Sequence, residues 1–135
     1  MSDVFTGIEH LAIAARSPEA LSDFYTRALG FRVQATFDNP DGQPKTYMLR
    51  LGNGPMLEIF PADRERAARE KQNVEPGIVH VAVLVSDFDE AARRLSQTAA
   101  RPEGEERPAA KGGRVRFYRD VEGNLFHILW RPEPL

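Results

Sequence analysis

The three histidines of this 135-residue sequence are its side chains best suited to bind a metal ion, and their positions are related. His10 and His80 are 70 positions apart, and His127 follows Glu58 by 69 positions. Each of the four lies in a largely apolar segment that predicts a β-strand. A carboxylate such as Glu58 in such a strand must be exposed, paired or metal-bound. Three imidazoles and one carboxylate suit a divalent ion of Zn, Ni, Co, Mn or Fe.

Side chains alternate between the two faces of a strand, and each of these four residues lies on the face opposite the more apolar one. Leu57 and Ile59, for example, flank Glu58 and point to the opposite side of their strand. The opposite faces of all four strands are apolar, and we expect helices to pack there. The four polar side chains then share the faces away from the helices, where a common metal site would form. The alternative for any single histidine is a structural role in its strand.

Two predicted helices separate the strands that carry these residues. Ser17 is the expected N-cap of the first helix, with Pro18 at its first position and Gly30 just beyond its end. Asp87 is the expected N-cap of the second helix, which continues through Leu95. The predicted strands cover residues 8–14, 31–37, 46–51, 56–60, 78–85, 114–118 and 125–130.

The order of strand, helix and further strands occurs twice, with an offset of about 70 residues. Such self-similarity indicates a duplicated unit in which each copy needs the other to bury its sheet. We therefore expect an α+β fold in which one domain consists of module 5–62 and module 77–132, joined by a linker, 63–76. Within the linker, residues 64–71 are compatible with a short surface helix. Residues 99–113 are expected to include a mobile loop, which would act either as a lid or as a simple connection.

The composition excludes several classes of function. The absence of cysteine excludes disulfides, thiolate catalysis and cysteine-ligated metals, and it is compatible with a cytoplasmic location. With a net charge of -2, the chain lacks the excess of positive charge that non-specific nucleic-acid binding requires. The sequence starts without a signal-peptide pattern and has no apolar run approaching the ~20 residues of a membrane span. We therefore expect neither nucleic acid nor a membrane as a partner.

Several segments of the sequence resemble the vicinal oxygen chelate superfamily, which includes glyoxalases, bleomycin-resistance proteins and extradiol dioxygenases. The segments are GIEHLAI at 7–13, LEIF at 57–60, VHVA at 79–82 and FYRD at 117–120, followed by EGN at 122–124. The resemblance extends from about residue 5 to residue 130. It implies paired βαβββ modules with curved mixed sheets around a metal-binding cavity. Carried over by position, the ligands are His10, Glu58, His80 and His127, although the last of these positions is commonly Glu in the family.

The resemblance implies a small-molecule substrate with two adjacent oxygens, which the metal would chelate while it stabilises a developing oxyanion. A glyoxalase-type lyase or isomerase, resembling lactoylglutathione lyase, is the leading hypothesis, with Glu58 or His127 as the base that moves a proton α to a carbonyl. An Fe(II)-dependent ring-cleaving dioxygenase is a second hypothesis. A metal-free protein that binds a small molecule such as an antibiotic is a third. The family also implies a homodimer, with ligands contributed by one chain or by two.

Three arginines close to the last strands have two interpretations. Arg114, Arg116 and Arg119 are suited to bind an anionic group of a substrate, such as a carboxylate. The alternative is a solvated edge strand protected by charge.

Overall fold

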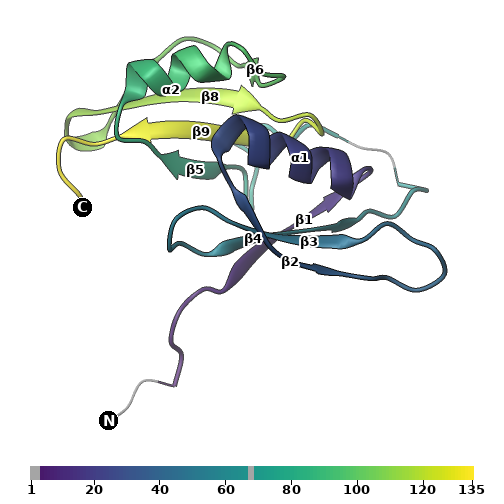
Figure 1. The fold of residues 1–135 in the computed structure, drawn as a ribbon. Coiled ribbons are helices and arrows are strands. Elements are labelled where there is room, and N and C mark those ends of the chain that lie inside the picture. Colours follow the sequence, from purple (N-terminus) through teal and green to yellow (C-terminus); the bar gives the residue numbers. More distant parts are fainter. Residues whose placement is uncertain (1–3, 67–68) are drawn as a thin grey trace. The chain divides into compact units, whose positions relative to one another are not determined.

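A computed structural model of the chain describes residues 4–66 and 69–135 and divides it into two compact units (Figure 1). Unit 1 comprises residues 1–66 and unit 2 comprises residues 67–135. Each unit has a sheet with both parallel and antiparallel strand pairs, together with an α-helix. The predicted α+β class is therefore confirmed, and each unit is described by itself.

Unit 1 has four strands in the spatial order β1-β4-β3-β2. Its elements are β1 (His10–Ala15), α1 (Pro18–Leu29), β2 (Arg32–Phe37), β3 (Thr46–Arg50) and β4 (Met56–Pro61). β1 runs parallel to β4, whereas β3 is antiparallel to both β2 and β4. The parallel pair brings the first strand of the unit beside its last strand.

Helix α1 begins and ends where its capping residues predict. The Ser17 hydroxyl accepts a hydrogen bond from the backbone N–H of Ala20, at 3.2 Å. Gly30 ends the helix with a left-handed φ of 78°, which costs a residue without Cβ little. The helix packs against the sheet of unit 1 and buries an apolar stripe. Its buried apolar and aromatic side chains include Leu21, Phe24 and Tyr25.

Unit 2 repeats this plan with additional short strands. Its elements are β5 (Val81–Leu84), α2 (Phe88–Leu95), β6 (Arg101–Pro102), β7 (Arg107–Ala109), a 3-10 helix (Ala110–Gly112), β8 (Gly113–Arg119) and β9 (Leu125–Trp130). The order is β5-β9-β8-β6, and β7 also pairs with β8. Asp87 caps α2 by accepting a hydrogen bond from the N–H of Glu90, at 3.1 Å, as the sequence predicts.

The two parallel strand pairs have equivalent registers. Ala12 of β1 lies opposite Glu58 of β4, and Ala82 of β5 lies opposite His127 of β9. Ala12 and Ala82 are 70 positions apart, whereas Glu58 and His127 are 69 apart. The duplicated sequence pattern thus corresponds to a duplicated strand register.

The strand predicted at 78–85 is shorter in the structure, where β5 begins at Val81. Val81 pairs with Phe126, and the partner strand β9 starts only one residue earlier, at Leu125. In this register residues 78 and 79 fall beyond the start of β9, so they have no strand residue with which to complete a ladder. The β-branched composition of this segment predicts a longer strand than the available partner supports.

The structure contradicts the helix predicted at 64–71 and, for 99–113, only the interpretation as a simple connection. The short helix predicted at 64–71 is absent from the described part of that segment, and residues 67 and 68 lie outside the description. The Asp63 carboxylate accepts the backbone N–H of Glu65, which stabilises a turn in place of a helix. The segment 99–113 is not a simple loop, because it contains β6, β7 and a 3-10 helix, and both strands pair with β8.

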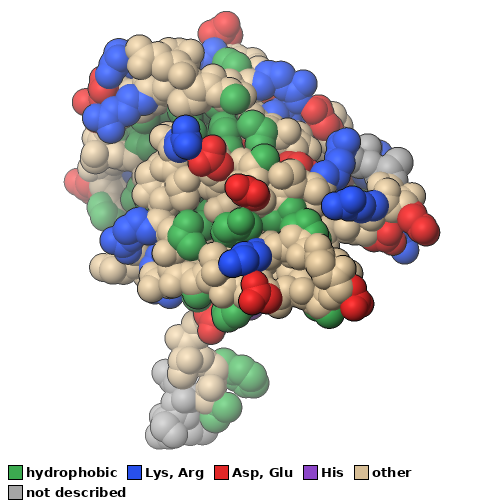
Figure 2. Space-filling view, turned by 45° about the vertical axis from the view of Figure 1, so that its right-hand side comes forward, with side chains coloured by type: hydrophobic (Ala, Val, Ile, Leu, Met, Phe, Trp, Pro, Cys, Tyr) green, Lys and Arg blue, Asp and Glu red, His purple; other side chains and the backbone are tan. Residues whose placement is uncertain are grey.

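The surface carries charges of both signs. On the face shown in Figure 2, Lys and Arg side chains are interspersed with Asp and Glu side chains, as expected for a net charge of -2. Among residues 4–66 and 69–135, no helix has the length and apolar character needed to cross a membrane.

Candidate metal site

In unit 1 the structure brings together His10 and Glu58. His10 opens β1, Glu58 lies in the adjacent parallel strand β4, and His10 Nε2 lies 3.9 Å from Glu58 Oε1. The His10 side chain is 36% exposed and that of Glu58 is 29% exposed, so both remain accessible. Leu57 and Ile59 on the other face of β4 are buried, in agreement with the predicted alternation.

A neighbouring carboxylate orients the ring of His10. Glu9 Oε1 lies 2.9 Å from His10 Nδ1. Because a carboxylate oxygen only accepts hydrogen bonds, this contact places the ring proton on Nδ1. The Nε2 lone pair of a neutral His10 is then available on the side of Glu58. A histidine that binds metal through one nitrogen commonly donates its other ring N–H in this way.

In unit 2 the structure brings together His80 and His127. Their ring centroids are 4.5 Å apart, with an angle of 38° between the ring planes. The Phe117 ring contacts both histidines in edge-on geometry, with centroid distances of 5.4 Å to His80 and 4.8 Å to His127. Two imidazoles in direct contact cannot both be protonated without electrostatic cost.

Burial keeps this histidine pair in the neutral form. Burial lowers the pKa of His127 to about 4, with smaller contributions from the positive charges of His80 and Arg131. Burial also lowers the pKa of His80. Both ring nitrogens of His127 are buried and have no hydrogen-bond partner among the residues that the structure describes. A neutral imidazole with a free lone pair is the form that binds a metal ion, so the donor set of this pair fits a divalent cation.

The four predicted ligands thus form two pairs, one in each unit. Within the described ranges, 4–66 and 69–135, no three His, Asp or Glu side chains are grouped as a complete metal site. His10 and Glu58 are described in unit 1, whereas His80 and His127 are described in unit 2. Each pair supplies two donor groups, and a tetrahedral site needs four ligands in all.

A surface cavity of about 560 Å³ in unit 1 has a different lining. It lies along α1 and includes Val33 and Tyr47 from the sheet, together with polar side chains of the helix. Asp23 and Arg27, two of the helix residues that line it, form an ion pair at 2.8 Å. None of the four predicted ligands contributes to this cavity, so it gives no support to the metal site.

The interpretation of β8 as a solvated edge strand is wrong, since β8 pairs with β9 on one side and with β6 and β7 on the other. Arg114 forms ion pairs with Glu106 and Asp89, at 2.7 Å and 2.9 Å. Arg119 is fully buried and donates two hydrogen bonds of 2.9 Å to the carboxylate of Glu103. Both arginines therefore have intramolecular acidic partners.

Another arginine, which the sequence did not single out, lies beside the histidine pair. The guanidinium carbon of Arg107 lies 4.8 Å from the centroid of the Phe117 ring, over its face. Phe117 in turn contacts both His80 and His127. Arg107 is exposed, and no carboxylate pairs with it among the contacts of the described residues. The sequence gives no stronger signal for Arg107 than its position within 99–113, where the composition predicts a mobile loop.

Comparisons with known proteins identify relatives that match nearly the whole chain. A curated relative, the ethylmalonyl-CoA/methylmalonyl-CoA epimerase of Cereibacter sphaeroides, is 30% identical over 127 residues, which cover 90% of this chain and 95% of the relative. A solved glyoxalase family protein from Enterococcus faecalis has a TM-score of 0.76 and 28% identity, and the match covers 93% of this chain and 98% of that one. A solved lactoylglutathione lyase from Agrobacterium tumefaciens shares the fold, with a TM-score of 0.65, 20% identity and coverage of 95% and 96%.

The family model also spans almost the whole chain. It matches residues 7–128, a range that contains His10, Glu58, His80 and His127. The expected resemblance to this family is therefore confirmed. The chain belongs to the Glyoxalase/Bleomycin resistance protein/Dioxygenase superfamily.

Proposed function

We propose that this protein is a metal-dependent enzyme that removes a proton from a carbon next to a carbonyl and returns it, as an epimerase or isomerase does. The observation that carries the proposal is the pair of donor sets at corresponding places in the internal repeat, His10 with Glu58 and His80, just before β5, with His127. Neither buried ring nitrogen of His127 has a hydrogen-bond partner among the described residues, and a coordinated cation would satisfy the one that carries the lone pair.

The four side chains would hold one divalent ion of Zn, Ni, Co, Mn or Fe. When bound, the ion would polarise two adjacent substrate oxygens and stabilise the negative charge that develops on them. Glu58 is the base that best fits proton transfer, because its carboxylate is 29% exposed and can reach a substrate. His127 is the alternative base, and its neutral form can accept a proton.

The epimerase relative favours a substrate class. Its name indicates acyl-CoA substrates with a carboxylate on the carbon next to the thioester, which makes that carbon acidic. We therefore place an acyl thioester with an α-carboxylate ahead of the glutathione adduct that a lactoylglutathione lyase would use. Both substrates require the same elementary step, the loss of a proton α to a carbonyl.

Metal content and proton exchange together test this proposal. We expect the purified protein to contain close to one divalent ion per site by plasma mass spectrometry and to exchange the α-hydrogen of methylmalonyl-CoA for deuterium in D₂O. His10→Ala should lose metal and exchange together, because it removes one of four donors. Full exchange by a metal-free protein would refute metal dependence. Binding of a small molecule without metal or exchange would identify a binding protein instead.

Arg107 is expected to bind the anionic group of the substrate. We predict that Arg107→Gln raises KM by roughly ten- to a hundred-fold with little change in kcat, as loss of one charge-assisted contact does. Arg107→Lys should recover part of the affinity, since it keeps the charge without the planar fork. Arg116→Gln is the matched control, because Arg116 lies over Tyr118 on the other face of β8. An equal effect of both substitutions would contradict the role of Arg107.

The two modules, 5–62 and 77–132, with the linker 63–76, are proposed to act as one domain in a homodimer. The metal ligands would then come from one chain or from two, and a mixing experiment with inactive variants separates these arrangements.

A further inference from the structure

We infer that Asn73, in the linker between the two modules, is a positioning residue for His80. Asn73 Oδ1 lies 2.6 Å from His80 Nδ1. Because an amide oxygen only accepts hydrogen bonds, this contact places the ring hydrogen of His80 on Nδ1 and leaves the lone pair on Nε2. The inference rests on the proposed function, in which Nε2 of His80 is a ligand of the metal ion.

The internal repeat shows why the linker has to supply this contact. In unit 1, Glu9 orients His10 and directly precedes it in the chain. The residue that precedes His80 is Val79, 70 positions after Glu9, and its side chain has no hydrogen-bonding atom. Asn73 reaches the equivalent nitrogen from seven residues upstream. The second module therefore obtains its orienting contact from outside the repeated segment.

A closed turn presents Asn73. The backbone N–H of Gln72 donates to Glu75 Oε2 at 2.5 Å, and the backbone N–H of Glu75 donates to the Gln72 carbonyl at 3.1 Å. Arg69 forms an ion pair with Glu75 at 2.8 Å. Asn73 lies inside this turn, so the two ends of the turn fix its backbone.

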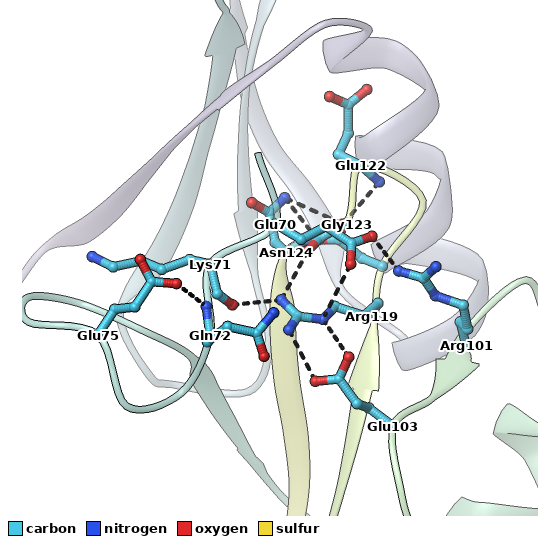
Figure 3. Close-up of polar contacts among 11 residues, drawn as sticks. Glu70, Lys71, Gln72, Glu75, Arg101, Glu103, Arg119, Glu122, Gly123 and Asn124 are labelled. Carbon is cyan, nitrogen blue, oxygen red and sulfur yellow. Dashed lines mark hydrogen bonds and ion pairs between the residues drawn. The ribbon is translucent and has the colours of Figure 1, made fainter. Parts of the chain in front are cut away.

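The buried Arg119 attaches this turn to the sheet of unit 2, as Figure 3 shows. Its Nη1 donates to the carbonyl oxygen of Lys71 at 2.8 Å, directly before the turn. The same guanidinium binds the Glu103 carboxylate through its other nitrogens, and Glu70 pairs with Arg101 on β6. The charged network therefore holds the linker on β8 and β6, and the linker holds the ring of His80.

Nitrogen NMR of the metal-free protein tests the tautomer directly. At a pH where His80 is neutral, we expect the wild type to show predominantly the Nδ1–H tautomer. Asn73→Ala should shift the population severalfold towards the Nε2–H tautomer, whereas Asn73→Asp, which keeps an acceptor oxygen, should retain the wild-type form. Gln72→Ala is the matched control, because it lies in the same turn and only its backbone N–H and carbonyl form the bonds described. Thermal unfolding of each variant verifies that it folds.

Competition with a chromogenic chelator measures the consequence for Zn²⁺ binding. Asn73→Ala should weaken Zn²⁺ affinity by about 10- to 100-fold, the usual effect of losing an orienting partner. Asn73→Asp should keep an affinity close to that of the wild type. An unchanged tautomer would overturn the inference, as would an altered tautomer with wild-type Zn²⁺ affinity. A wild type that binds no metal ion would instead refute the proposed function, while the tautomer measurement would still decide whether Asn73 orients His80.

Discussion

Glu58→Gln is expected to abolish stable metal binding and to lower kcat by about a thousand-fold. The substitution keeps the size of the side chain but removes the only carboxylate among the four predicted ligands. It also removes the base proposed to take the α-proton. Plasma mass spectrometry of the purified variant measures the bound metal, and deuterium exchange into methylmalonyl-CoA measures the chemistry.

Glu19→Gln serves as the control for this substitution. Glu19 lies in the first turn of α1, away from the β1–β4 pair that carries His10 and Glu58. Its replacement should leave metal content and exchange at the wild-type level. If Glu58→Gln retained metal and lost only exchange, Glu58 would be a base without being a ligand. Retention of both properties would refute any role of Glu58 in the site.

The same variant identifies which chains supply the ligands. Glu58→Gln and His127→Ala should each be inactive alone. If the ligands come from two chains, re-associated mixed dimers contain one intact site and one doubly damaged site. An equal mixture should then recover about a quarter of wild-type activity, because half of the dimers are mixed and each of these has one of two sites intact. If each site is built from a single chain, the mixture should remain inactive.

Local chemistry made much of the fold predictable from the sequence. Ser17, Gly30 and Asp87 fixed the helix limits because capping depends on residues within a few positions of the helix end. The alternation around Glu58 likewise indicated which face of β4 is buried. The offset of 70 positions predicted that the strands carrying the histidines occupy equivalent places.

Residues whose roles depend on distant contacts could not be identified from the sequence. Asn73 lies in a polar linker, and nothing in its surroundings indicates that its amide contacts a histidine seven residues later. The burial of Arg119 arises from contacts with Glu103, Lys71 and Gly123, which tertiary structure brings together. A charged residue beside other arginines suggests an exposed strand until the sheet order is known.

Segment lengths were uncertain for a related reason. Residues 78 and 79 have strand-like surroundings in the sequence, but in the observed register they fall beyond the first residue of β9 and cannot pair with it. Residues 101–102 and 107–109 contain proline and charged residues, which disfavour strands. They nevertheless form β6 and β7, which pair with the edge of β8 that faces away from β9. Strand formation depends on the partner as much as on the sequence of the segment itself.

Glu103→Ala is expected to lower the free energy of unfolding by about 2–3 kcal/mol. The substitution removes the carboxylate that accepts two hydrogen bonds from Arg119, whose side chain is 0% exposed. The Arg119 guanidinium then keeps its hydrogen bonds to the carbonyl oxygens of Lys71 and Gly123, but it loses the carboxylate that lies closest to it. We place the effect below that of a fully buried pair because the Glu103 side chain is 44% exposed. Urea unfolding followed by circular dichroism measures the change.

Three further variants, one of them Arg119→Met alone, show whether the loss of stability arises from the poorly compensated charge of Arg119. Glu106→Ala breaks an ion pair with Arg114 at the surface and should leave the urea midpoint almost unchanged, since water solvates both groups. Glu103→Ala combined with Arg119→Met should be more stable than Glu103→Ala alone, because it removes a buried guanidinium whose one remaining carboxylate, that of Glu70, lies 4.0 Å away. If the double variant were as unstable as the sum of the two single variants, the network would stabilise unit 2 through packing and hydrogen-bond geometry. The explanation by a poorly compensated charge would then be wrong.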